Sequence, residues 1–270
     1  MHKRPVSFAS QGDDRETPAR ALQDIVRVLQ LLSLPAATTT LYDPYYCQGG
    51  IKTRLAALGY PNVINEPVDF YQTVHNKAVP AYDVLLTNPP YSGNHIRKAL
   101  EFACAAVEIA GGGGGGGNGG GGGGGSKPWC MLLPSNVHAR EWYERVVRSE
   151  ASPPLFLCPH ERYSFLVPSD TSDASAPPQE HVPYVTMWYI GGLTPLDRAA
   201  LLATWKQEAA SASTTLAGTP AELPRRVRKL MRYKKCGGGK KNKKGHGKKK
   251  KKKKSSGVDS SENHKRRRIK

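Results

Sequence analysis

Short apolar runs alternate with helical patterns along most of this chain, and the alternation limits the folds open to it. Strand-like runs occur at residues 38–42 and in "PNVINEP", "AYDVLLTNPP" and "PWCMLLPS", with helical runs in "IKTRLAALGY" and "NHIRKALEFACAAVEIA". Such alternation is typical of a parallel sheet covered by helices. Three more strand-like runs, "PLFLCP", "ERYSFLVP" and "YVTMWYIG", cluster later in the chain. We therefore expect an α/β fold with a mostly parallel sheet and a terminal antiparallel hairpin.

A helix is expected before the first strand. Its apolar residues recur at helical spacing: Leu22, Ile25, Val26, Leu29 and Leu32. Thr17 is suited to cap the N-terminus of this helix, and Pro18 is suited to its first turn. Gly59 is expected at the C-terminal stop of the next helix.

Three segments are expected to stay outside the folded core. Residues 111–126 are glycine except for Asn118 and Ser126, and residues 225–270 hold 23 Lys and Arg against 2 Asp and Glu. The whole chain carries +18, so the basic charge belongs to the tail and the rest is slightly acidic. We expect a flexible N-terminus (1–14), one domain (15–224) with a disordered glycine insert, and a disordered polybasic tail.

Cysteine spacing and hydropathy limit the class of protein. The five cysteines, Cys47, Cys104, Cys130, Cys158 and Cys236, show no metal-binding spacing and favour a reduced, intracellular compartment. No apolar run approaches the roughly 18 residues of a membrane span. The N-terminal residues lack the apolar stretch of a secretion signal.

The strand at residues 84–87 ends abruptly on Asn88, Pro89, Pro90 and Tyr91. In open α/β sheets, ligands bind beyond the carboxyl ends of the strands. Because the prolines donate no hydrogen bond, carbonyl and amide oxygens dominate this turn. A planar group with an exocyclic amine suits these acceptors, with the tyrosine ring on its face. The alternative is an ordinary strand-terminal turn.

"NPPY" after a strand resembles the catalytic motif of S-adenosylmethionine-dependent amino-methyltransferases, which act on adenine N6, guanine N2 or the glutamine side-chain amide. The resemblance implies a Rossmann-like methyltransferase fold and S-adenosylmethionine as cofactor. It implies that Asn88 and the carbonyl of Pro89, next to Pro90, bind the target amine and that Tyr91 stacks on the base. No strong general base is expected, because orientation for in-line transfer is the main contribution of such an enzyme.

"YDPYYCQGG" resembles the cofactor loop of the same family, in which an acidic residue, a proline and an aromatic residue precede alternating glycines. Asp43, Tyr45 and Gly49 match this pattern, whereas Cys47 stands where glycine is usual. The resemblance implies that these residues lie beside the cofactor. A plain β-turn is the alternative.

Three further residues complete the implied cofactor site. Glu66 ends the next strand, where a carboxylate accepts ribose hydroxyls in doubly wound nucleotide sites. Asp69 in "VDFY" resembles the family's adenine-binding Asp-Phe motif, although only two residues separate it from Glu66. Thr17 in "ETP" resembles the Thr-Pro motif near the methionine end of the cofactor. Solvated acids and a helix cap are the alternatives for these residues.

The basic tail points to nucleic acid. Lysine and arginine runs bind phosphate backbones without reading sequence, and they resemble nuclear import signals. We therefore expect a nuclear or nucleolar enzyme that methylates adenine N6, in RNA rather than DNA, with import receptors as partners of the tail and no membrane partner. Trp142 and Tyr143 either contact nucleic acid or pack on the sheet. A protein glutamine methyltransferase and a non-enzymatic RNA-binding factor on the same fold are the rival functions.

Overall fold

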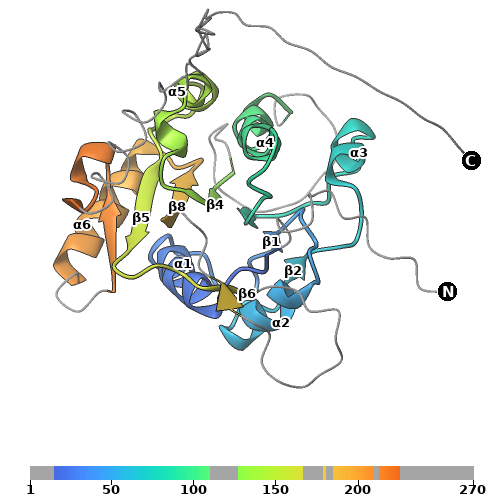
Figure 1. The fold of residues 1–270 in the computed structure, drawn as a ribbon, viewed down its shortest axis with the longest axis horizontal. Coiled ribbons are helices and arrows are strands. Elements are labelled where there is room, and N and C mark those ends of the chain that lie inside the picture. Colours follow the sequence, from blue (N-terminus) through green and yellow to red (C-terminus); the bar gives the residue numbers. More distant parts are fainter. Residues whose placement is uncertain (1–14, 110–126, 167–178, 181–184, 209–212, 226–270) are drawn as a thin grey trace, which may run out of the picture.

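The computed structural model describes residues 15–109, 127–166, 179–180, 185–208 and 213–225. The elements in chain order are α1 (Ala19–Leu31), β1 (Leu41–Tyr42), α2 (Gly50–Ala57), β2 (Val63–Ile64), α3 (Phe70–His75), β3 (Val84–Thr87), α4 (His95–Ile109), β4 (Trp129–Pro134), η1 (Val137–Ala139), α5 (Glu141–Val147), β5 (Leu155–Pro159), β6 (Phe165–Leu166), β7 (Gln179–Glu180), β8 (Thr186–Gly191), α6 (Pro195–Glu208), β9 (Thr214–Ala217) and η3 (Pro220–Glu222). Within these residues, one seven-stranded sheet has the order β2-β1-β3-β4-β8-β5-β9, and β6 pairs separately with β7. The α/β class is confirmed (Figure 1).

Strand direction divides the sheet into two parts. β1 pairs in parallel with β2 and β3, and β3 pairs in parallel with β4. β8 runs antiparallel between β4 and β5, and β9 runs antiparallel beside β5. β5 therefore points the same way as β1 to β4. The mostly parallel sheet is confirmed. The terminal hairpin was expected between the "ERYSFLVP" and "YVTMWYIG" runs, and this pairing is wrong, because β8 pairs antiparallel with β4 and β5 instead.

Several details of the prediction are wrong. The first strand covers only Leu41–Tyr42, and the "ERYSFLVP" run leaves the main sheet and supplies only Phe165–Leu166 to the β6–β7 ribbon. Pro18 occupies the N-cap of α1 without a side-chain hydrogen bond, so Thr17 does not cap the helix. The prediction also lacked α6 and β9. The segment that forms β9 is short and weakly apolar, and its pairing with β5 decides its conformation.

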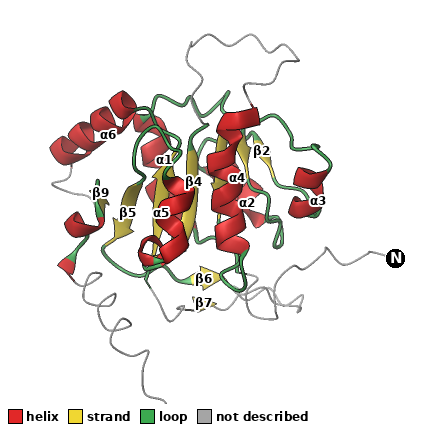
Figure 2. Ribbon diagram, turned by 90° about the horizontal axis from the view of Figure 1, so that it is seen from above, coloured by secondary structure: helices red, strands yellow, loops and turns green. Residues whose placement is uncertain are grey.

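Helices cover both faces of the sheet (Figure 2). α1, α2 and α6 bury apolar side chains against one face, and α3, α4 and α5 bury theirs against the other. The strands supply both cores by alternation. In β3, for example, Val84 and Leu86 join the first core and Leu85 joins the second.

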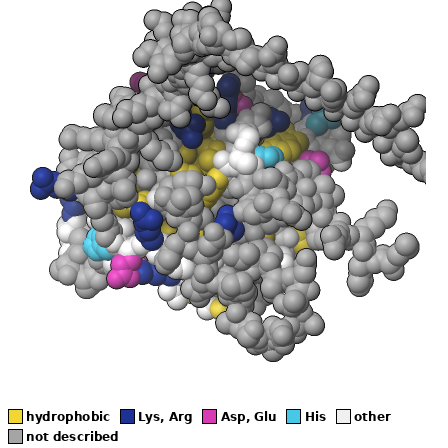
Figure 3. All heavy atoms as spheres, in the orientation of Figure 1, with side chains coloured by type: hydrophobic (Ala, Val, Ile, Leu, Met, Phe, Trp, Pro, Cys, Tyr) yellow, Lys and Arg dark blue, Asp and Glu magenta, His cyan; other side chains and the backbone are white. Residues whose placement is uncertain are grey.

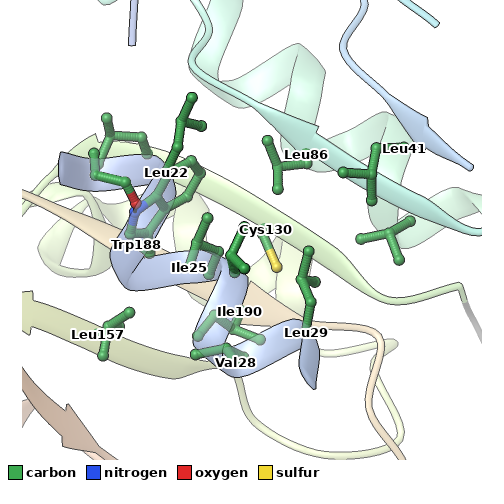
Figure 4. Close-up of a cluster of buried hydrophobic side chains, with 14 of the residues drawn as sticks. Leu22, Ile25, Val28, Leu29, Leu41, Leu86, Cys130, Leu157, Trp188 and Ile190 are labelled. Carbon is green, nitrogen blue, oxygen red and sulfur yellow. Dashed lines mark hydrogen bonds between the residues drawn. The ribbon is translucent and has the colours of Figure 1, made fainter. Parts of the chain in front are cut away.

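α1 is the main helix of the first core. Four of its predicted core residues are buried: Leu22, Ile25, Val26 and Leu29. Leu32 is only half-buried, because the helix has already ended at Leu31. Figure 4 shows the α1 side chains among those of the sheet, with Trp188 of β8 beside Leu22.

We expect Trp188→Phe to lower the free energy of unfolding by about 1–2 kcal/mol. Trp188 is fully buried, and its Nε1 donates a hydrogen bond of 2.9 Å to the carbonyl of Ala21 in α1. The variant loses this bond and part of the packing between helix and sheet. Urea unfolding measures the loss. The half-buried Trp142 provides the control as Trp142→Phe, and equal losses at both positions would contradict the account.

The segments predicted to lie outside the core cannot be compared with the structure. The N-terminus, the glycine insert and the basic tail, apart from Arg225, lie outside the described residues. In the part of the chain that the structure covers, no helix has the length and apolar character to cross a membrane. Cys104, Cys130 and Cys158 are free thiols and buried.

Candidate functional site

The two predicted motifs meet where β1 and β3 end side by side. Asp43 follows β1 and Asn88 follows β3, and the strands pair in parallel with Tyr42 opposite Leu85. Their carboxyl ends therefore lie at the same edge of the sheet. The hydroxyl of Thr87, the last residue of β3, donates a hydrogen bond of 2.5 Å to Oδ1 of Asp43. This bond joins the NPPY turn to the start of the segment "YDPYYCQGG" (residues 42–50), which we call the glycine loop.

Asp43 is a buried acid within this connection. The backbone N–H of Tyr45 also donates to its Oδ1, at 3.2 Å. Burial raises the pKa of Asp43 from 3.8 to about 7, the hydrogen bonds from Thr87 and Tyr45 oppose the rise, and the negative charge of Glu16 adds to it. The carboxyl of Asp43 therefore stabilises the loop from inside the protein, and its contact with a cofactor stays a prediction.

Asn65 is a second brace of the loop, and sequence reasoning missed it. It follows β2 directly and is fully buried. Its Nδ2 donates to the carbonyls of Asp43, at 3.0 Å, and Tyr45, at 3.3 Å. Its Oδ1 has no hydrogen-bond partner among the described residues. The sequence feature that could have indicated this role is the position of Asn65, directly between an apolar strand and Glu66.

The backbone of the glycine loop turns through left-handed conformations. Cys47 has φ 50° and Gly49 has φ 76°. A Cβ on Gly49 would lie 2.9 Å from the ring of Tyr46, whose side chain would have to shift, and the left-handed conformation itself favours glycine there. Cys47 therefore adopts a conformation that suits glycine better, and this strains the backbone without removing the turn.

Cys47→Gly is expected to raise the free energy of unfolding by roughly 0.5–1 kcal/mol. Left-handed geometry costs a non-glycine residue about 1–2 kcal/mol, and the greater freedom of glycine in the unfolded chain offsets part of the gain. Chemical denaturation measures the difference. Cys47→Ala keeps the Cβ and removes the thiol, so it serves as the control. An equal gain in the alanine variant would show that backbone strain is not the cause.

Glu16 reaches the same loop from the segment before α1. Its Oε1 accepts the backbone N–H of Gly50 at 2.9 Å, and its Oε2 pairs with Nη2 of Arg54 at 2.5 Å. A Cβ on Gly50 would lie 2.5 Å from this carboxylate. Thr17, the next residue, is buried. Its contact with a cofactor stays a prediction, and sequence reasoning did not include Glu16 in the site.

Asn88 and Tyr91 are held together on the other side of the site. Nδ2 of Asn88 donates to the carbonyl of Arg15 at 3.0 Å. The hydroxyl of Tyr91 lies 2.8 Å from Oδ1 of Asn88 and 3.0 Å from the carbonyl oxygen of Leu132. The amide is thus fixed in orientation, with its oxygen toward the tyrosine.

The rest of the NPPY turn is packed against the protein. Pro89 and Pro90 are buried. The ring of Tyr91 is nearly perpendicular to that of Phe165 in β6, with centroids 6.5 Å apart and planes at 85°. Phe165 is itself buried. Phe165 belongs to the "ERYSFLVP" run, which was expected in the terminal hairpin, and the structure instead brings it to the candidate site.

The segment between β5 and β6 carries Phe165 to this position. Because β5 points the same way as β3, the chain leaves β5 at the edge of the sheet that holds the NPPY turn. The hydroxyl of Tyr163 donates to Oδ2 of Asp24 in α1 at 2.7 Å, and Arg20 pairs with Glu161 at 2.8 Å. Contacts between residues distant in sequence therefore position the ring of Phe165 beside Tyr91.

Glu66 and Asp69 have local roles in the structure. Glu66 is half-exposed and pairs with Lys52 at 2.6 Å. Asp69 caps α3, because its Oδ1 accepts the N–H groups of Tyr71 at 2.8 Å and Gln72 at 3.1 Å. In the described chain, no strand separates β2 from α3, so both acids lie in one short connection. Ribose and adenine contacts by these acids stay predictions.

An aromatic cluster connects this region to the start of α4. Phe70 is buried against Tyr45 and Phe102, with centroids 5.4 and 5.1 Å away. The hydroxyl of Tyr71 lies 3.2 Å from that of Tyr45 and 2.5 Å from Nδ1 of His95. The cluster thus links the glycine loop, the start of α3 and the helix that follows NPPY.

The aromatic residues of α5 pack on the sheet. Tyr143 is buried and its ring meets that of Tyr189 in β8, with centroids 5.9 Å apart, while Trp142 is half-buried beside it. Arg140 and Arg145 are exposed. The packing interpretation is therefore confirmed for this helix.

Comparisons with known proteins leave the site to be judged by its geometry. Neither the protein-family models nor the curated proteins match this chain. Among the residues that the structure describes, no three His, Cys, Asp or Glu side chains gather in a way that suits a metal ion.

Proposed function

We propose that this protein transfers the methyl group of S-adenosylmethionine to an exocyclic amine, on a Rossmann-like methyltransferase fold. The observation that carries the proposal is the hydrogen bond from Thr87 to Asp43, which joins the glycine loop to the NPPY turn at adjacent strand ends. Methyl transfer requires donor and acceptor side by side for in-line attack. The parallel strands that carry both motifs, followed by antiparallel strands, support the fold assignment.

Asn88 and Pro89 are the proposed holders of the target amine. The phenol of Tyr91 has one proton and lies within reach of two acceptors, Oδ1 of Asn88 and the carbonyl of Leu132. When the phenol donates to the carbonyl of Leu132, Oδ1 of Asn88 is available to accept a hydrogen bond from the amine. The phenol then still has an acceptor, and so does the amine. Acceptors on both amine hydrogens direct the nitrogen lone pair toward the methyl group.

Tyr91 and Phe165 are the proposed walls for the planar group that bears the amine. Their perpendicular rings form an aromatic corner beside Asn88. Aromatic side chains stack on any base, because every base has a π face. A nucleobase therefore suits this corner better than a flexible side chain does, which favours adenine N6 over a glutamine amide.

The glycine loop fits S-adenosylmethionine, whose sulfonium and ammonium groups are cationic. Glu16 places negative charge at the loop, close enough to raise the pKa of Asp43, and Tyr46 and Glu16 lie against the backbone at Gly49 and Gly50. When bound, the cofactor supplies an electrophilic methyl group. The residues proposed to surround it are Thr17, Asp43, Tyr45, Cys47, Gly49, Glu66 and Asp69.

Nucleic acid is the proposed substrate class, with RNA favoured over DNA. The 23 Lys and Arg of residues 225–270 suit phosphate backbones and nuclear import receptors, so we place the protein in the nucleus or nucleolus. Basic side chains also lie beside apolar ones on the face shown in Figure 3. A glutamine methyltransferase would use the same NPPY turn. The strained Cys47 favours the second rival, a non-enzymatic RNA-binding factor.

Cofactor binding is the first test of the proposal. We expect micromolar binding of S-adenosylmethionine by calorimetry, and weaker binding by Asp69→Asn. Asparagine preserves the cap of α3, so this variant separates charge from folding. No binding by the wild-type chain would favour the non-enzymatic rival.

Transfer of a radiolabelled methyl group then identifies the substrate class. We expect incorporation into structured RNA that contains adenine, and loss of it when residues 226–270 are removed. Incorporation into protein that persists without the tail would instead favour the glutamine methyltransferase.

A further inference from the structure

We propose that Glu16 and Arg54 form the receptor for the amino-acid end of the cofactor, with Glu16 binding the α-ammonium and Arg54 the α-carboxylate. The inference rests on the proposed function, since it assigns residues to one part of the proposed cofactor. Sequence patterns indicated neither residue, and the ion pair between them is seen only in the folded chain.

The geometry places this pair at the glycine loop. Glu16 accepts the N–H of Gly50, the first residue of α2, and pairs with Arg54 one turn later on the same helix. The side chains of Glu16 and Arg54 are 11% and 20% exposed, so the pair is largely shielded from water and not a surface contact. Nε of Arg54 is buried and has no hydrogen-bond partner among the described residues.

The charges at this helix end select against phosphate. The N-terminus of a helix attracts anions, and a glycine loop before it is the usual setting for a phosphate. Here the carboxylate of Glu16 already occupies that position, and its charge is close enough to raise the pKa of the neighbouring Asp43. A phosphate would be repelled, whereas a ligand that brings its own cation beside its own anion would be accepted.

Exchange of partners makes the pair a suitable receptor for an amino acid. The ligand's ammonium replaces Arg54 beside Glu16, and its carboxylate replaces Glu16 beside Arg54. Each protein charge keeps an opposite charge throughout, so no buried charge is left without compensation. The planar guanidinium of Arg54 also matches a carboxylate with two parallel hydrogen bonds.

Ligands that lack parts of the amino acid test the inference on the wild-type chain. Calorimetry would compare S-adenosylhomocysteine, decarboxylated S-adenosylmethionine, which lacks the carboxylate, and 5′-methylthioadenosine, which lacks both charged groups. We expect the last to bind at least about tenfold more weakly than S-adenosylhomocysteine, which is about 1.4 kcal/mol. Equal binding of these two would overturn the inference and leave the proposed function standing. If none of the ligands bound, the proposed function would fail and the inference with it.

Two variants assign the two charges. Glu16→Gln should weaken S-adenosylhomocysteine about tenfold or more and leave 5′-methylthioadenosine within about twofold. Arg54→Gln should weaken S-adenosylhomocysteine but not the decarboxylated ligand. The exposed pair Arg97–Glu101 on α4 provides the control as Arg97→Gln, and thermal unfolding reports whether each variant is folded. A loss that is the same for every ligand would show that the pair only holds the fold.

Discussion

Asn88→Ala will lose methyl transfer while it still binds S-adenosylmethionine. Removal of one preorganised hydrogen-bonding group at a reacting centre typically lowers kcat by about 10²–10³. We expect a loss at the upper end of this range, because Asn88 both accepts from the amine and fixes the turn through the carbonyl of Arg15. The cofactor loop is braced separately, by Asp43 and Asn65, so cofactor affinity should stay within about threefold, or below about 1 kcal/mol.

Single-turnover transfer of a labelled methyl group to RNA, together with calorimetry of the cofactor, measures both quantities. Asn76→Ala is the matched control, because Asn76 is an exposed asparagine at the C-terminus of α3. Full activity of Asn88→Ala on a substrate that the wild-type chain methylates would refute the role of the NPPY turn. Equal loss of cofactor binding would instead assign Asn88 to the structure of the loop.

Asp43 will make the protein less stable as pH rises toward neutrality. The unfolded chain ionises this carboxyl near pH 3.8, whereas burial delays ionisation in the folded chain to about pH 7. Between these values the folded state binds the proton more tightly, so the stabilisation is complete below the lower value and is lost as pH rises through the higher one. From about pH 5 to about pH 8 the loss should reach about 3 kcal/mol.

Asp43→Asn removes this dependence and keeps an oxygen for Thr87 and Tyr45. Urea unfolding at several pH values should therefore show that the free energy of unfolding of the variant increases relative to that of the wild type as pH rises. Asp83→Asn is the control, because Asp83 is exposed and also accepts a backbone N–H, from Thr40. A constant difference between Asp43→Asn and wild type across the pH range would contradict the buried, protonated carboxyl.

The elements that the sequence predicted well are those with strong local patterns. They are the apolar face of α1, the buried strand β3 and the end of α2 at Gly59. Each depends on residues that are neighbours in the chain. The same holds for the NPPY turn and the glycine loop, whose residue types are tied to backbone conformations. Thr17 shows the limit of such reasoning. It is a good capping residue, but the N-cap position of α1 is occupied by Pro18.

The residues that sequence reasoning missed all act through distant contacts. Glu16 meets Gly50 and Arg54 across the start of the fold. Asn65 holds carbonyls of a loop twenty residues earlier. Phe165 reaches Tyr91 because Tyr163 and Glu161 are attached to α1. No pattern within a short window reports such partners.

The sequence by itself determined the α/β class, the helical and strand faces, and the two motifs that end β1 and β3, because periodicity and turn chemistry are local properties. Only the tertiary structure decided that these motifs share a hydrogen bond, that Asp43 is buried, and that Glu16 and Arg54 meet at the glycine loop. Parallel pairing brings strand ends together regardless of their separation in the chain. Burial and charge proximity then depend on the whole assembly and not on any one segment.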